Sequence, residues 1–187
     1  MTENLQNIFH SLGLEEKTLA EIYKNIRTET FKDKDIIAPV NNRSKDACFI
    51  ESGILRVFYS TTDKDVTFHF LSENEFTLSP YSIYQDTISR FGLESIGTSI
   101  VSVIDFQILN CILENNKAFG LLKEQLFAKY IVEANERLFY AKFTTPKERY
   151  EHLMKTNPKL FNRVPLGYIA SYLGITQETL SRLRAKK

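Results

Sequence analysis

The chain has 187 residues, of which 43% are hydrophobic, 25% are charged and two are cysteines. This length suits one large domain or two small ones, and the composition excludes a disordered or collagen-like chain. No apolar run approaches the roughly 18 residues that a membrane helix needs, and two cysteines are too few for a disulfide framework. The amino end carries acidic residues where a secretory signal would have basic ones, so we expect a cytoplasmic protein without a membrane partner.

Charge is unevenly distributed along the chain. Residues 143–187 carry nine Lys and Arg residues against three acidic ones, a net charge of +6, whereas residues 1–142 have a net charge of −5. Such an asymmetry indicates that the basic end meets a polyanion while the remainder has a different role. Charge alone leaves one alternative open, in which the basic end is a solvated surface that binds no polyanion.

The first 30 residues are predicted to be helical, because apolar residues recur at helical spacing on both sides of Gly13. From Phe31 to about Ile104, short β-strands alternate with polar turns, and tight turns are predicted at Ser52-Gly53 and around Gly97-Thr98. Strands so close in sequence favour an antiparallel sandwich or roll. No helical segment separates them, as a parallel sheet would require.

After Asp105 the apolar spacing becomes helical again, which predicts a short helix over 106–114 and a long one over 117–143. Apolar residues recur at every fourth position of the long helix: Leu122, Leu126, Tyr130, Ala134 and Leu138. A helix with such an apolar surface can pack one side against its own domain and leave the other side for a partner helix. We therefore predict a dimerisation helix, with packing on the β domain alone as the alternative. A further helix is predicted from Pro146 to about Thr156.

The last residues have the layout of a helix-turn-helix, with helices predicted over 166–173 and from Thr176 onward. Gly174 allows the positive φ of a sharp turn, Ala170 is small where the helices approach, and Thr176 can cap the second helix. Outward-facing Arg, Gln and Glu side chains at such a helix read guanine, adenine and cytosine in the major groove, and nearby cations contact phosphates. The predicted DNA-binding residues are Thr176, Gln177, Glu178, Ser181, Arg182, Arg184 and Lys186.

Two stretches resemble the Crp/Fnr family of bacterial transcription regulators. Residues 168–182 are similar to its recognition motif, and residues 51–59 resemble the glycine-marked strand pair of its cyclic-nucleotide-binding-like β-roll. The order of roll, long helix and helix-turn-helix is similar over essentially the whole chain. The linker at residues 145–150 and the short carboxyl end resemble a short branch that is common in Bacteroidetes-type bacteria.

This resemblance implies an α+β fold. An antiparallel, cupin-like β-roll with flanking helices would occupy residues 1–116, a dimerisation helix 117–143, and a helix-turn-helix without a carboxyl-terminal wing 144–187. It further implies a homodimeric, sequence-specific transcription regulator that binds two-fold symmetric double-stranded DNA. RNA polymerase and an unknown small-molecule effector would be further partners, and no cofactor is expected.

Family members that bind cyclic AMP carry a Gly-Glu pair and an Arg-Ser pair in their phosphate-binding segment. The corresponding residues 75–91 contain neither pair, and their single cation, Arg90, lies close in sequence to Asp86 and Glu94. One Arg beside acids is a poor cradle for a phosphate. We therefore expect no response to cyclic AMP, and Arg90 is the residue predicted for an effector pocket.

Catalytic and metal-binding motifs are not found in the sequence. The three His residues lack metal-ligand spacing, and no phosphate loop or nucleophile motif is present. His69, flanked by Phe68 and Phe70, is predicted to be a packed or edge histidine rather than a haem ligand. We expect a protein that is not an enzyme. The alternative to a regulator is a small-molecule-binding or protein-docking module whose helix-turn-helix no longer reads DNA.

Overall fold

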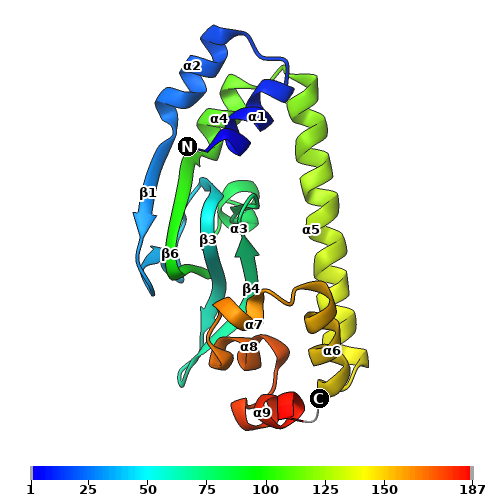
Figure 1. Ribbon diagram of the computed structural model, residues 1–187. Helices are drawn as coiled ribbons and strands as arrows, with labels where there is room; N and C mark the ends of the chain where they lie inside the picture. The colour runs from blue at the N-terminus through cyan, green and yellow to red at the C-terminus, as the bar shows by residue number, and fades with distance from the viewer. Residues whose placement is uncertain (1, 186–187) are drawn as a thin grey trace.

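The computed structural model describes residues 2–185 and confirms the expected α+β fold with an antiparallel sheet. Figure 1 shows helices at both ends of the sheet and one long helix, α5 (Lys117–Phe143), running beside it from one end to the other. The amino-terminal helices cover one end, and the carboxyl-terminal helices lie at the opposite end.

The sheet has the strand order β1-β6-β3-β4, with β2 paired to β6 and β5 paired to β3. Its members are β1 (Arg27–Phe31), β2 (Ile36–Ala38), β3 (Asp46–Ser60), β4 (Asp65–Ser72), β5 (Phe76–Leu78) and β6 (Gly92–Asp105). β3 and β6 pair along almost their whole length, from Asp46 opposite Asp105 to Phe58 opposite Gly92. Each of the other four strands pairs with one of these two long strands.

The predicted tight turns at Ser52-Gly53 and Gly97-Thr98 are wrong, because β3 and β6 continue through both positions. The register between the two strands shifts on each side of Ser52, which marks β-bulges. Gly53 has a φ of +103°, and a Cβ built on it would lie 2.7 Å from the Cα of Ser99. The glycine therefore permits a bend where two backbones nearly touch, and the chain does not reverse there.

Three helices pack on one end of the sheet: α1 (Glu3–Ser11), α2 (Glu16–Asn25) and α4 (Phe106–Ile112). Their apolar faces form one buried cluster with the sheet residues Phe49 and Ile104. The helical prediction holds as far as Asn25, after which Arg27–Phe31 becomes strand β1 and pairs with β6. Tertiary pairing thus overrides the local pattern at this point. A short helix, α3 (Pro80–Tyr84), follows β5.

Four helices follow α5: α6 (Pro146–Thr156), α7 (Leu160–Arg163), α8 (Leu166–Leu173) and α9 (Gln177–Ala185). A capping box begins α6, since the Glu148 N–H donates to Thr145 Oγ1 and the Thr145 N–H donates to Glu148 Oε2 at 2.7 Å. The buried side chains of α6–α9 form one cluster that also includes three residues of the sheet, Ile54, Phe70 and Ile96. The helix-turn-helix and the sheet therefore share a hydrophobic core.

Candidate nucleic-acid interface and effector cavity

The turn between α8 and α9 is fixed by its backbone. Gly174 has a φ of +66°, and the Ile175 N–H donates to the carbonyl of Ala170 at 3.0 Å. Ala170 is 3% exposed and Leu180 is fully buried, so the small residue and the leucine lie at the contact between the helices. At the start of α9, the Thr179 N–H donates to Thr176 Oγ1 at 3.2 Å, which is the cap that the sequence predicts.

The predicted DNA-binding side chains lie on the outer surface of α9 and its cap. The exposed ones are Thr176, Gln177, Glu178, Ser181, Arg182 and Arg184, whereas Lys186 lies outside the described residues. The backbone N–H of Glu178 and then the Thr176 side chain lower the pKa of the Glu178 carboxyl. Glu178 is therefore ionised at neutral pH and can only accept hydrogen bonds, as a contact to cytosine N4 requires.

Two basic residues of the carboxyl-terminal helices already have hydrogen-bond acceptors within the protein. Arg149 donates from Nε to the Leu173 carbonyl at 2.9 Å and from Nη1 to the Thr144 carbonyl at 2.7 Å. It therefore satisfies a free carbonyl at the end of α8 and ties that helix to the end of α5. Arg163 pairs with Glu73, and this guanidinium lowers the pKa of the Glu73 carboxyl to about 2. Fewer cations are free to contact phosphates than the count of basic residues suggests.

α8 lies directly against β4. The Thr67 backbone N–H donates to Ser171 Oγ at 3.0 Å, and the rings of Phe70 and Tyr172 have centroids 5.4 Å apart. The Arg163–Glu73 pair is a third link, with Nη1 of Arg163 at 3.0 Å from the carboxylate. The helix-turn-helix is thus held to the roll by polar and aromatic contacts as well as by the shared core.

A buried ion pair lies under α8. Arg56 of β3 is 2% exposed, and its Nη2 is 2.9 Å from Glu94 Oε2 of β6. The ring of Tyr168 covers the guanidinium, with its centroid 3.9 Å from the Arg56 Cζ. Arg56 Nε and Glu94 Oε1 are both buried without a hydrogen-bond partner. Tyr168 of α8 therefore covers this charged pair, which lies between the sheet and the helix-turn-helix.

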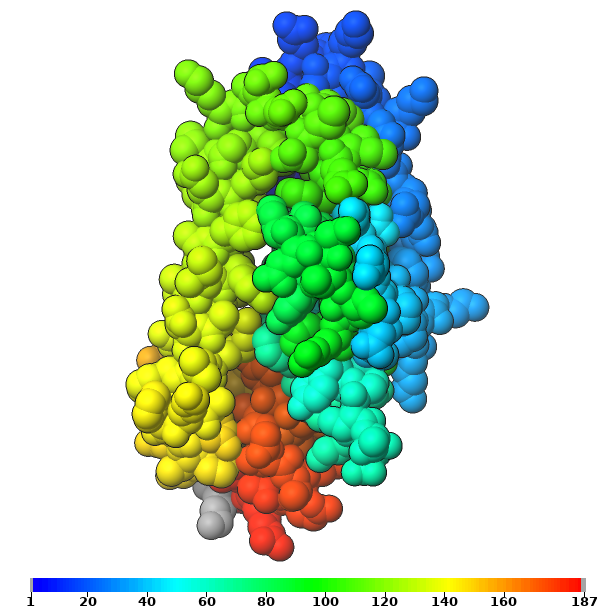
Figure 2. All heavy atoms as spheres, turned by 180° about the vertical axis from the view of Figure 1, so that it is seen from behind, coloured from blue at the N-terminus to red at the C-terminus, as the bar shows by residue number. Residues whose placement is uncertain are grey.

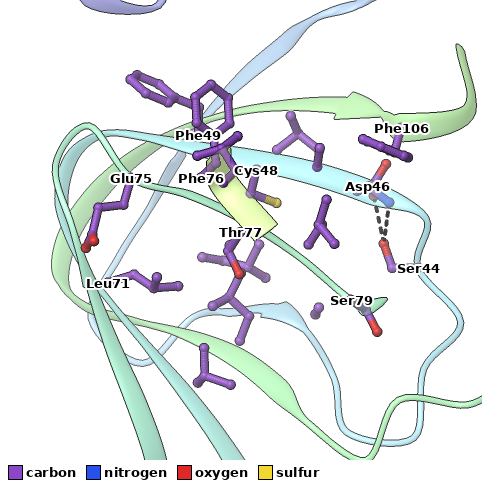
Figure 3. A pocket seen from close by; sticks show the side chains of 18 of the residues that line it. Ser44, Asp46, Cys48, Phe49, Leu71, Glu75, Phe76, Thr77, Ser79 and Phe106 are labelled. Atoms are coloured by element: carbon purple, nitrogen blue, oxygen red, sulfur yellow. Dashed lines mark hydrogen bonds between the residues drawn. The ribbon is translucent and has the colours of Figure 1, made fainter. Parts of the chain in front are cut away.

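A cavity of about 510 Å³ lies inside the roll and extends to α5. Figure 2 shows α5 separated from the roll by a hollow on the face opposite to that of Figure 1. Figure 3 shows Cys48, Leu71 and Thr77 projecting into the interior, with Ser44 and Asp46 hydrogen bonded at its edge. Burial raises the pKa of the Cys48 thiol to about 12, so this thiol stays uncharged. The lining is mainly apolar and suits a small molecule.

The structure places the other predicted site residues as follows. Leu122, Leu126 and Tyr130 of α5 line the cavity, Ala134 is half-buried, and Leu138 is 51% exposed. The row predicted for dimerisation thus lies largely on the side of α5 that faces the roll, and dimerisation itself stays a prediction. Arg90 is exposed and does not belong to the lining, so the geometry gives it no place in this pocket.

Sequence reasoning missed Arg137, which lines the cavity together with His69. Arg137 Nη1 and His69 Nδ1 are 3.5 Å apart. Burial lowers the pKa of His69 to about 3, and the charges of Arg137 and Lys129 act in the same direction, so the imidazole is neutral. The three- and four-residue spacing of Tyr130, Ala134 and Arg137, which places them on one face of α5, is the signal that could have found this residue.

Neither a membrane span nor a metal centre is found in the described part of the chain. Within residues 2–185 no helix is both long and apolar enough to cross a bilayer. No three His, Cys, Asp or Glu side chains of these residues are grouped so that they could hold a metal ion.

The sequence matches no family model, and no curated protein matches it. Solved structures do match. A CooA mutant from Carboxydothermus hydrogenoformans is 19% identical, with a TM-score of 0.73 over 96% of this chain and 83% of that one. The regulator CLP from Xanthomonas campestris, which responds to c-di-GMP, is 11% identical, with a TM-score of 0.71 over 92% and 91% of the two chains.

A third match is a protein from Eubacterium rectale described as a transcriptional regulator of the Crp/Fnr family. It is 16% identical, with a TM-score of 0.71 over 91% of this chain and 82% of that chain. All three similarities extend over the roll, the long helix and the carboxyl-terminal helices, since each covers more than nine-tenths of this chain. The chain therefore has the fold of the Crp/Fnr regulators, built on a cyclic-nucleotide-binding-like β-roll.

Proposed function

We propose that this protein is a cytoplasmic, sequence-specific DNA-binding transcription regulator. The observation that carries this proposal is the exposed amino-terminal end of α9, where Gln177, Glu178 and Arg182 stand on a closed hydrophobic core. A recognition helix presents this end to base edges in the major groove, and each bidentate contact contributes about 1–3 kcal/mol of discrimination. No catalytic role is proposed for any residue.

The regulator would act as a homodimer through α5. Six apolar side chains of this helix are more than half exposed: Leu121, Ile131, Val132, Leu138, Phe139 and Phe143. Water would be excluded from this face if a second copy of α5 covered it. Two recognition helices related by a two-fold axis would then bind half-sites about one helical turn apart.

The cavity would hold an effector other than cyclic AMP. Two observations support this. Residues 75–91 contain a single cation, Arg90, and that side chain is exposed outside the cavity. A cyclic phosphate would therefore find no counter-charge in the segment that usually supplies it. An effector would shift the position of α8 and α9 only by binding one arrangement more tightly than another.

DNA binding can be tested by fluorescence anisotropy of purified protein on DNA fragments selected from a random pool. We expect selective binding that weakens steeply with salt, and Arg182→Ala should reduce affinity for the selected site by about tenfold, because one base contact is lost. The same variant should also discriminate less between bases at one base pair in each half-site. Lys24→Ala, which removes an exposed cation on α2 at the opposite end of the molecule, should change affinity less than twofold.

Unselective or undetectable DNA binding would contradict the proposal. The internal roles of Arg149 and Arg163 favour one alternative, a protein-docking module, because they reduce the charge available for phosphates. Such a module would bind its protein partner through an apolar contact with little dependence on salt, so the same salt series separates the two functions.

A further inference from the structure

Four cations line the cavity between the roll and α5, and three of them already have oxygen partners. The cations are Arg27, Lys123, Lys129 and Arg137. Arg27 pairs with Glu29 and Asp46, each at 2.9 Å. Lys129 lies 3.5 Å from Glu75 and 3.7 Å from Glu133, and the Lys123 ammonium donates to Asn110 Oδ1 at 2.7 Å.

Arg137 differs from the other three. It forms no ion pair with any of the described residues, and its Nη2 is buried without a hydrogen-bond partner. Its Nη1 faces His69, which is neutral and supplies no negative charge. A buried charged donor without an acceptor is unfavourable, so a ligand that brings an acceptor to Nη2 would gain a charge-assisted hydrogen bond.

The surroundings of Arg137 limit the charge of such a ligand. Its guanidinium lies over the rings of Phe68 and Tyr130, at 5.2 and 6.0 Å, which hold it in place without neutralising it. The nearby carboxylates Glu75 and Glu133 share one cation, Lys129, so these three groups carry a net charge of −1 and sum to zero with Arg137, and each further negative charge on a ligand would be unfavourable. A monoanion suits this balance better than a doubly charged phosphate would.

The rest of the cavity limits the body of the ligand. Beyond the Arg137 end, aliphatic side chains of four different strands line the interior, among them Ile37, Val57, Leu71 and Val103. A flexible or planar apolar group of a ligand would displace water from these side chains. This displacement is the main source of affinity for the uncharged part of a ligand.

We propose that the cavity binds an apolar monocarboxylate, with its carboxylate on Arg137 and its hydrocarbon body inside the roll. This inference rests on the proposed function, because it names the chemical class of the effector for the cavity described above. Arg137 lies on α5, and its neighbour His69 lies on β4, the strand that contacts α8. The carboxylate would therefore bind where the long helix meets the strand that supports the helix-turn-helix.

Isothermal titration calorimetry of the full chain with sodium decanoate, below its micelle concentration, tests the proposal. Decanoate should bind, 1-decanol should bind more weakly, and Arg137→Met should reduce the decanoate affinity by about tenfold or more while leaving decanol binding unchanged. Methionine keeps the unbranched apolar stem of the side chain and removes the unpartnered donor, so we expect the variant to fold. 4-Phenylbutyrate serves as a second, aromatic probe.

Two matched variants control for a general loss of positive charge. Lys24→Met removes an exposed cation on α2 that does not line the cavity, and Arg90→Met removes an exposed arginine outside the cavity. Each should change the decanoate affinity less than threefold. Equal binding of decanoate and decanol, an unchanged affinity of Arg137→Met, or no binding of either acid would overturn the proposal.

The DNA-binding assay separates this inference from the function on which it rests. Decanoate that binds through Arg137 without altering DNA affinity would support the ligand class and contradict its role as effector. Selective DNA binding by a protein that binds neither acid would support the regulator and overturn the carboxylate proposal. A change in DNA affinity that disappears in Arg137→Met would support both.

Discussion

Gly53 lies where β3 bends across β6, and its environment admits no side chain. Its φ of +103° is strained for any other residue, and a Cβ there would lie 2.7 Å from the Ser99 Cα. Gly97, in the strand opposite, also has a positive φ, of +68°, but a Cβ on it would meet nothing within 4 Å. Substitutions at the two glycines therefore distinguish the effect of backbone strain from the effect of a steric clash.

We expect Gly53→Ala to lower the free energy of unfolding by about 3 kcal/mol or more, because strain and overpacking act together. Gly97→Ala, which introduces strain alone, should cost about 1 kcal/mol. Urea denaturation followed by circular dichroism measures both values. Equal costs for the two variants would show that the close approach of β3 and β6 does not constrain residue 53.

At the scale of single elements, α5 has two apolar faces in different surroundings. One face lines the cavity, and the other, which contains Leu121, Val132 and Phe139, is exposed. The spacing of these three residues, eleven and then seven positions, places them on one side of the helix. We expect this side to meet a second copy of the chain.

Val132→Asp should therefore convert a dimer into a monomer, because it places a charge in the middle of the exposed face. Ile108→Asp, which changes an apolar residue on α4 that is 43% exposed, should leave the dimer intact. Sedimentation velocity distinguishes the two species. A wild-type monomer, or a dimer that persists in Val132→Asp, would rule out pairing through this face.

The sequence predicts the boundaries of α5 better than its faces. Asn116 caps the helix at the Phe119 N–H, and the predicted range of 117–143 agrees with the observed one. Apolar residues occur on nearly every side, so the rows beginning at Leu121 and Leu122 both have helical spacing. Spacing alone could not decide which row faces the roll, since that depends on where the strands lie.

The helix-turn-helix was more predictable, because its signals are local. The small Ala170, the turn Gly174 and the cap Thr176 lie within seven residues of one another. Arg137 was not predicted as a cavity residue, because its neighbour His69 is 68 positions away in the chain. Contacts of this range follow from the way that β4 and α5 come together, and they leave little trace in local patterns.

At the scale of the whole molecule, the roll and the helix-turn-helix are expected to unfold together, because Ile54, Phe70 and Ile96 belong to the core of α6–α9. Phe70→Ala should cost about 3–5 kcal/mol and should accelerate hydrogen exchange in α8 and α9 as well as in β4. Phe49→Ala removes an equally buried ring from the cluster at the opposite end, and should affect α1 and α2 more than α8.

Hydrogen exchange followed by mass spectrometry resolves these segments. If Phe70→Ala accelerated exchange in the sheet alone and left residues 166–173 unchanged, the helix-turn-helix would be an independent folding unit. That result would also weaken any mechanism in which the roll controls the position of α9 through this contact.

β4 is the last strand in the order of the sheet, and α8 covers it there, with Ser171 accepting the backbone N–H of Thr67. An uncovered strand at this position would offer unpaired backbone groups and the ring of Phe70 to other chains, which is a route to aggregation. The helix that packs against the proposed recognition helix thus also protects the roll from self-association. A fragment that ends at residue 143 would lose this cover, and we expect it to precipitate where the full chain stays dispersed.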